Sequence, residues 1–114
     1  MPFIFAFMSE TRLKTLLKFY EEDPADPFNV YALALEYQKT DLIKSDELFS
    51  NLLTDFPDYV PAYYHAARLK VELNDPQAAL AIYQKGIGIA KRQDEKKAEQ
   101  ELRSAYEELM FDLE

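Results

Sequence analysis

Few residues in this 114-residue chain have the type and spacing that catalysis requires. His65 is the sole histidine, which excludes zinc and di-iron sites built from two or more imidazoles. The sequence has no cysteine, and therefore no thiolate nucleophile, thiolate metal site or disulfide. Gly86 and Gly88 have the spacing of part of a phosphate-binding loop, but such loops follow a strand and open a helix, whereas this pair lies late in a helical pattern. We therefore expect no catalytic residue, no metal and no cofactor.

The charge pattern favours a protein or peptide as the partner. Thirteen basic and 21 acidic residues give a formal net charge of −8 at pH 7. Because proteins that bind the phosphate backbone are usually basic, we do not expect nucleic acid as a partner. The acidic runs at 21–23 and 107–108 match no calcium-loop spacing, and we interpret them as solvated helix faces. An enzyme that uses two carboxylates with pKa values pushed apart stays a hypothesis without a motif to support it.

The N-terminal segment is apolar, and we set residues 1–8 apart as an extension. It has no basic region and no small-residue cleavage site, so it is not a secretory signal, and no stretch approaches the roughly 20 apolar residues of a membrane span. Two explanations of this apolar segment stay open. Either translation starts naturally at Met8, or the segment folds into a groove of its own molecule or of a neighbouring one. With no cysteine and no span, we expect a cytoplasmic protein.

Apolar residues recur at three- and four-residue spacing, which predicts six helices and no strand. We expect the helices to begin near Ser9, at Pro27, after Asp41, near Tyr59, at Pro76 and near Asp94. Three breaks precede proline, where the helical conformation is disfavoured: Asp23-Pro24, Phe56-Pro57 and Asn74-Asp75-Pro76. We expect Gly86 at a tight helix crossing, whereas nothing in the sequence explains Gly88.

Residue types recur at a nearly constant period. The pairs Asp41/Asp75 and Phe49/Tyr83 are both 34 residues apart, and the pairs Pro24/Pro57 and Val30/Tyr63 are both 33 apart. This pattern resembles the tetratricopeptide repeat, a helix-turn-helix unit of about 34 residues with the motif W-x-x-L-G-x-x-Y…A-x-x-x-F…P. The first unit fits as Val30, Leu33, Ala34, Tyr37, Ser45, Phe49 and Pro57. The second fits as Tyr63, Ala66, Ala67, Lys70, Ala79 and Tyr83, with Lys91 in place of the proline.

The resemblance implies an all-α fold. Residues 9–92 are expected to form antiparallel helix pairs stacked as a short right-handed α-solenoid, and residues 93–114 a capping helix of the same domain. A plain helical bundle is the alternative architecture.

The resemblance also implies a peptide-binding concave face, lined by the first helix of each unit. The residues that turn away from the inter-helix core on those helices are Tyr31, Leu35, Gln38, Tyr64, His65, Arg68 and Val71. We expect Tyr31 and Tyr64 to be neighbours across the groove. Tyrosine and arginine are enriched in binding hot spots. In the opposing interpretation the terminal helix folds back and buries these residues as core.

The partner class follows from the same positions. Members of the family hold acidic C-terminal peptides with a clamp of Lys, Asn and Arg, but here only Arg68 fits that role. We therefore expect an aromatic groove with a single cation, suited to a segment with an apolar anchor and one acidic group. The first hypothesis is a non-catalytic protein–protein interaction scaffold. The second is a self-associating structural protein, in which the groove or the N-terminal segment forms a homodimer contact.

Overall fold

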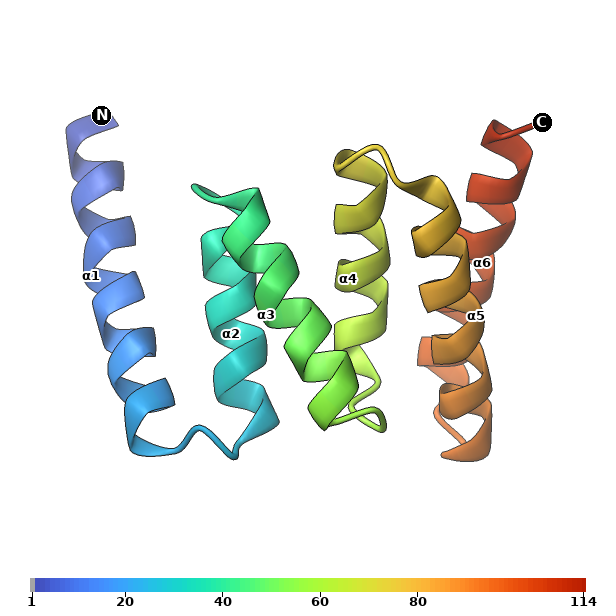
Figure 1. The fold of residues 1–114 in the computed structure, drawn as a ribbon, viewed down its shortest axis with the longest axis horizontal. Helices are drawn as coiled ribbons and strands as arrows, with labels where there is room; N and C mark the ends of the chain where they lie inside the picture. The colour runs from blue at the N-terminus through green and yellow to red at the C-terminus, as the bar shows by residue number, and fades with distance from the viewer. Residues whose placement is uncertain (1) are drawn as a thin grey trace. The chain divides into compact units, whose positions relative to one another are not determined.

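The computed structural model describes residues 2–114, with side chains from residue 10 onward. Within that range the chain forms six helices and no strand, as predicted (Figure 1). The helices are α1 (Pro2–Glu22), α2 (Pro27–Tyr37), α3 (Leu42–Asp55), α4 (Pro61–Glu72), α5 (Pro76–Arg92) and α6 (Lys96–Asp112). The chain divides into two compact units, Met1–Leu52 and Leu53–Glu114, so that the last turn of α3 belongs to the second unit.

The start of α1 differs from the expectation. The helix begins at Pro2 rather than near Ser9, so residues 2–8 are part of α1. Met1 lies outside the described residues. The physical reason is that proline suits the first helical position, where no N–H is needed, and no helix breaker follows it before Asp23-Pro24. The break at Asp23-Pro24 is confirmed, since α1 ends at Glu22.

In the first unit, α1 packs against α2, and side-chain hydrogen bonds fix the connections. The Asn29 amide donates to the carbonyl oxygens of Phe19 and Asp23, at 3.2 and 3.1 Å, and so satisfies backbone acceptors at the end of α1. The buried Ser45 hydroxyl donates to the Ala34 carbonyl oxygen at 2.7 Å and joins α3 to α2. The buried apolar residues of this unit are Val30, Leu33, Ala34, Leu48, Phe49 and Leu52.

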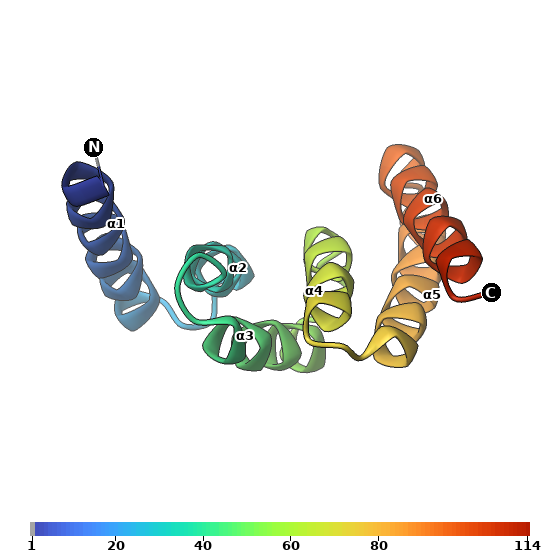
Figure 2. The same ribbon diagram turned by 90° about the horizontal axis from the view of Figure 1, so that it is seen from above.

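In the second unit, α5 lies beside both α4 and α6, and α4 also contacts α6 (Figure 2). The core consists of Val60, Tyr63, Ala67, Ala79, Tyr83, Ile87, Ile89, Ala90, Leu102 and Leu109. Helix α6 contributes Leu102 and Leu109 to this core, whereas Met110 is exposed. It follows Leu109 directly and is therefore rotated by about 100° around the helix axis.

Gly86 allows a close approach between helices of the second unit. A Cβ atom at this position would lie 2.7 Å from Tyr63 Cβ on α4 and 3.2 Å from Leu102 Cδ1 on α6. The expected tight crossing is thereby confirmed. At Gly88 an added Cβ would meet no described atom within 4 Å, so nothing in the structure explains this glycine.

Residues in the left-handed conformation end α4 and α5. Asn74 has φ 62° and Asp94 has φ 57°. After Asn74, the Asp75 N–H donates to the Lys70 carbonyl oxygen at 2.8 Å, the 6→1 bond of a Schellman motif, and the equivalent bond after Asp94 is 2.9 Å long. The Asp75 carboxylate then accepts from the Ala78 N–H and caps α5. The turn at Asp94 explains why α6 begins at Lys96 rather than at the residue expected.

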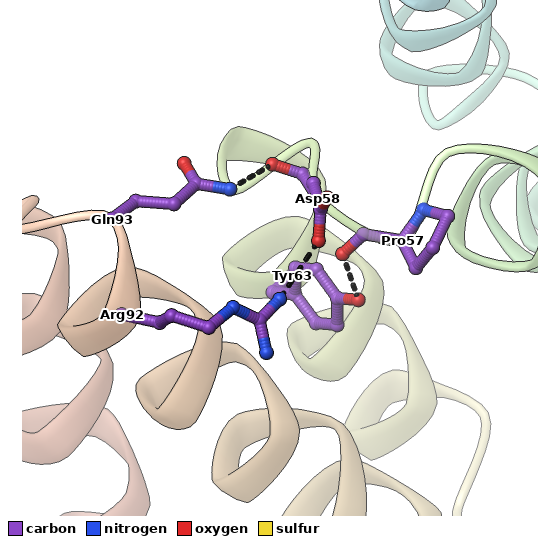
Figure 3. Close-up of polar contacts among 5 residues, drawn as sticks. All are labelled: Pro57, Asp58, Tyr63, Arg92 and Gln93. Atoms are coloured by element: carbon purple, nitrogen blue, oxygen red, sulfur yellow. Dashed lines mark hydrogen bonds and ion pairs between the residues drawn. The ribbon is translucent and has the colours of Figure 1, made fainter.

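Polar contacts hold the turn between α3 and α4 against the end of α5 (Figure 3). The buried Tyr63 hydroxyl donates to the Pro57 carbonyl oxygen at 2.6 Å. Arg92 Nη2 lies 2.9 Å from Asp58 Oδ1, and the Gln93 side-chain amide donates to the Asp58 carbonyl oxygen at 2.8 Å. Because both members of the Arg92–Asp58 pair are exposed, that pair contributes little stability, and the buried tyrosine matters more. Because of this turn, α4 begins at Pro61 and not near Tyr59 as expected.

Candidate functional site

A pocket of about 300 Å³ lies among α4, α5 and α6 in the second unit. Helix α4 contributes Tyr64, Arg68, Val71 and Glu72. Helix α6 contributes Ala105, Glu108, Leu109 and Asp112, and α5 contributes Tyr83. We call this the α4–α6 pocket. On each of the two outer helices the lining residues follow three- and four-residue spacing, so each helix offers one continuous face to the pocket.

Tyr64 is the centre of the aromatic part of the pocket. Its ring meets the Tyr83 ring edge-on, with centroids 6.4 Å apart and an interplanar angle of 64°. It also meets the His65 ring edge-on at 5.6 Å. The Arg68 guanidinium carbon lies 5.8 Å from the Tyr64 ring centroid, within the range of a cation–π contact. These contacts restrict the Tyr64 ring and hold the guanidinium at the pocket.

Tyr83 is the buried polar residue of the pocket. Its side chain is only 3% exposed, yet it lines the pocket. Burial raises the pKa of its hydroxyl, and the charges that act on that pKa come from Tyr64, Arg68 and Glu108, which line the same pocket. Within residues 2–114 the Tyr83 hydroxyl makes no hydrogen bond. The Tyr83 hydroxyl can therefore donate a hydrogen bond to, or accept one from, a group bound in the pocket.

Carboxylates dominate the charge of the lining. Glu72, Glu108 and Asp112 face one guanidinium, that of Arg68. Over the described part of the chain, none of these four side chains forms an ion pair with another residue. The pocket wall therefore carries more negative than positive charge.

The structure brings together only part of the predicted site. Tyr64, Arg68 and Val71 line the pocket, and His65 lies beside Tyr64 without lining it. Burial, followed by the Arg68 charge, lowers the pKa of His65, which favours its neutral form at pH 7. Tyr64 and His65 are half-buried, whereas Arg68 and Val71 are exposed. Helix α6 packs against α4 without sealing this face.

The predicted residues of α2 lie in the other unit. Tyr31, Leu35 and Gln38 are half-buried, and Gln38 follows the last residue of α2. The Tyr31 ring meets Phe49 edge-on at 6.5 Å, and burial raises the pKa of its hydroxyl. Because Tyr31 and Tyr64 belong to different units, their expected pairing across a groove stays a prediction.

Sequence reasoning missed the α6 wall and Tyr83. Glu108 was interpreted as part of a solvated face, and Tyr83 as core alone. A signal was present, because Ala105, Glu108, Leu109 and Asp112 follow the i, i+3, i+4, i+7 pattern of one helix face. That pattern contains polar residues, so a search for apolar periodicity passes over it.

Within residues 2–114, no group of His, Asp or Glu side chains is arranged to hold a metal ion. None of the helices in that range combines the length and apolarity of a transmembrane segment.

Comparison with known proteins gives matches among solved structures. No protein-family model and no curated protein matches the chain. The solution NMR structure of a tetratricopeptide repeat domain protein from Salinibacter ruber is 38% identical, with a TM-score of 0.73, and the match covers 76% of this chain and 89% of that one. A crystal structure of the tetratricopeptide repeat domain protein from the same organism is 35% identical, with a TM-score of 0.72 and coverage of 75% and 97%.

A third structure is similar in fold alone. The crystal structure of PcrH in complex with the chaperone binding region of PopD matches with a TM-score of 0.83 at 14% identity, over 96% of this chain and 84% of that one. Together the three structures confirm the helical-repeat fold expected from the 34-residue period, over the alternative of an unrelated helical bundle.

Proposed function

We propose that this chain, which belongs to the tetratricopeptide repeat family, is a non-catalytic scaffold that binds a segment of another protein in the α4–α6 pocket. The supporting observation is the pocket itself, in which side chains of three helices surround a space of about 300 Å³. PcrH, whose fold is similar, was solved in complex with the chaperone binding region of PopD. A cytoplasmic location is part of the proposal, since a chain without cysteine suits a reducing compartment.

The chemistry of the lining suits a peptide. Tyr64 and Tyr83 offer large rings with polar ends, and Val71 and Leu109 offer apolar area beside them. Such mixed surfaces bind a side chain through its apolar part and orient it through a few polar contacts. We also propose His65 and the α2 residues Tyr31, Leu35 and Gln38 as contact residues.

Selection from a library of random displayed peptides on the full-length chain tests this proposal. We expect the chain to enrich a family of related peptides, and the double variant Tyr64→Ala with Arg68→Ala to lose them. Tyr64 and Arg68 provide the ring and the guanidinium of the pocket, so their loss removes contacts on which a bound segment depends. The single variant Tyr64→Ala removes the ring alone and is used if the double variant does not fold.

The matched control is Gln77→Ala with Lys85→Ala. Both residues are exposed on α5 outside the pocket, and the pair removes the same single positive charge. Circular dichroism verifies that each variant is folded. If the wild-type chain and the folded pocket variants enrich the same peptides equally, the peptides do not bind in the α4–α6 pocket and the proposal is wrong.

Self-association is the second candidate function. The end of α6 exposes Met110, Phe111 and Leu113, and Phe111 is 74% exposed. Apolar side chains that are exposed together favour contact with a second copy. Light scattering over a range of concentrations would support this function if the wild-type chain dimerises and Phe111→Ser or a deletion of residues 1–7 does not. A monomer at all concentrations would contradict it.

A further inference from the structure

We infer that the α4–α6 pocket selects a cationic side chain, a Lys or Arg of the bound segment, and not an acidic one. The inference rests on the proposed function and adds the chemical class of the ligand. The sequence alone predicts an acidic ligand group, because Arg68 is the only charge expected in the groove. The structure adds three carboxylates to the same pocket, those of Glu72, Glu108 and Asp112.

The balance of charges gives the first argument. Three carboxylates and one guanidinium leave an excess of two negative charges on the lining. Within the described residues these carboxylates are not neutralised by ion pairs, so a bound cation would not have to displace one. An acidic ligand group would gain Arg68 but would face like charge on both outer helices. The net charge of −8 for the whole chain acts in the same direction.

The ends of the helices give the second argument. Glu72 is the last residue of α4 and Asp112 the last of α6. The two helices run in the same direction, so both carboxyl ends lie at one end of the unit (Figure 1). Unpaired backbone carbonyls make a helix C-terminus partly negative, and acidic residues there are normally unfavourable. Helix α6 has no basic residue in its last turn, and Lys70 of α4 does not line the pocket. A cation supplied by the partner would stabilise both ends.

The walls give the third argument. A Lys or Arg side chain has an apolar stem and a charged head, and Val71, Ala105 and Leu109 offer apolar contacts for such a stem. The Arg68 guanidinium carbon lies 5.8 Å from the Tyr64 ring centroid, and a ligand cation that displaces it would gain the same cation–π contact. The buried Tyr83 side chain has a hydroxyl without a hydrogen bond in the described chain, and this oxygen is an acceptor for an N–H donor.

A metal ion is a poorer occupant than an organic cation. In the part of the chain that the structure describes, no three acidic or imidazole side chains are close enough to ligate one metal. Carboxylates that are spread over the wall of a pocket instead suit an extended cation that carries several N–H donors.

The test uses the peptides selected by the full-length chain. We expect Lys or Arg at one fixed position of the selected family, next to an apolar residue. In a fluorescence titration of one such peptide, replacing its Lys or Arg by Gln should weaken binding about tenfold, as expected for the loss of two or three partly exposed charge contacts. Glu108→Gln with Asp112→Asn should weaken the original peptide by a similar factor, and Tyr83→Phe should weaken it several-fold.

The matched control is Glu101→Gln with Glu107→Gln. Both residues are exposed on α6 outside the pocket, and the variant loses the same two charges. We expect little effect, because charges off the pocket act only through the screened field of the whole protein.

The outcomes separate this inference from the proposed function. Selected peptides that depend on Tyr64 but carry Asp or Glu, or no charge, at the fixed position would overturn the inference and leave the scaffold function intact. Equal weakening by the pocket and control variants would also overturn it. A chain that selects no peptide family through the pocket would contradict both.

Discussion

The close approach at Gly86 leads to a sharp stability prediction. In Gly86→Ala the new Cβ would lie 2.7 Å from Tyr63 Cβ and 2.9 Å from Tyr63 Cγ, about 1 Å short of an ordinary carbon–carbon contact. These atoms adjoin the α4 backbone, so rotation of the tyrosine cannot relieve the overlap. Overpacking of this kind costs about 1–3 kcal/mol, whereas alanine gains roughly 1 kcal/mol of helix propensity over glycine. We expect a net loss of up to about 2 kcal/mol in the free energy of unfolding.

Gly88→Ala is the matched control two positions further along the same helix. It makes the same chemical change, but its Cβ meets no described atom within 4 Å. Only the propensity term remains, and we expect a gain of about 0.5–1 kcal/mol.

Urea-induced unfolding followed by far-ultraviolet circular dichroism measures both variants. For a chain of this size, 1 kcal/mol corresponds to roughly 4 °C in Tm, so thermal unfolding provides a second measurement. We expect the two midpoints to move in opposite directions from the wild type. If Gly86→Ala is as stable as Gly88→Ala, the packing of α4, α5 and α6 described above is wrong.

Four further substitutions test the connections between helices and one titrating group. Tyr63→Phe removes the buried hydrogen bond to the Pro57 carbonyl oxygen and should lower the free energy of unfolding by about 1 kcal/mol. Arg92→Ala removes an exposed ion pair and, in the same urea titration, should change the free energy of unfolding by less than about 0.5 kcal/mol. Asp75→Ala removes the N-cap of α5 and should cost about 1 kcal/mol, measured by thermal unfolding. The pKa of His65 is lowered from 6.5 by burial and then by a nearby guanidinium, so the unfolded state binds more protons just below pH 6.5. The free energy of unfolding of the wild type should therefore decrease as the pH falls from 6.5 towards the pKa of His65 in the folded state. The variant His65→Gln should lack this decrease. If the free energies of unfolding of the two proteins depend on pH in the same way, His65 is not the group responsible.

The sequence predicts most helix boundaries because local chemistry sets them. Proline with a preceding aspartate marks the start of α2 and of α5, and both are confirmed. The start of α1 was wrong because an apolar run at a terminus was interpreted as a tail, although Pro2 suits a first helical position. The start of α6 was misplaced because Asp94 adopts a left-handed conformation, which a non-glycine residue adopts only where its surroundings favour it.

The candidate site was only half predictable for a different reason. The spacing of Tyr64, Arg68 and Val71 places them on one face of α4 whatever surrounds the helix, and all three line the pocket. The opposite wall depends on the rotation of α6 about its own axis, which places Leu102 close to Gly86 of α5. That rotation is a property of three helices together, so the spacing within α6 groups Glu108 with Ala105, Leu109 and Asp112 on one face but does not predict what that face meets.

Helix α6 therefore has two roles on adjacent faces. One face contributes Leu102 and Leu109 to the core, and the neighbouring face contributes Glu108 and Asp112 to the pocket. A helix that only covered the end of the core would gain from basic residues in its last turn, and α6 has none. Acidic residues at that end oppose the helix dipole and so do not serve stability. If the pocket takes a cationic side chain as proposed, binding of that cation between α4 and α6 would recover the stability that these residues cost the free chain.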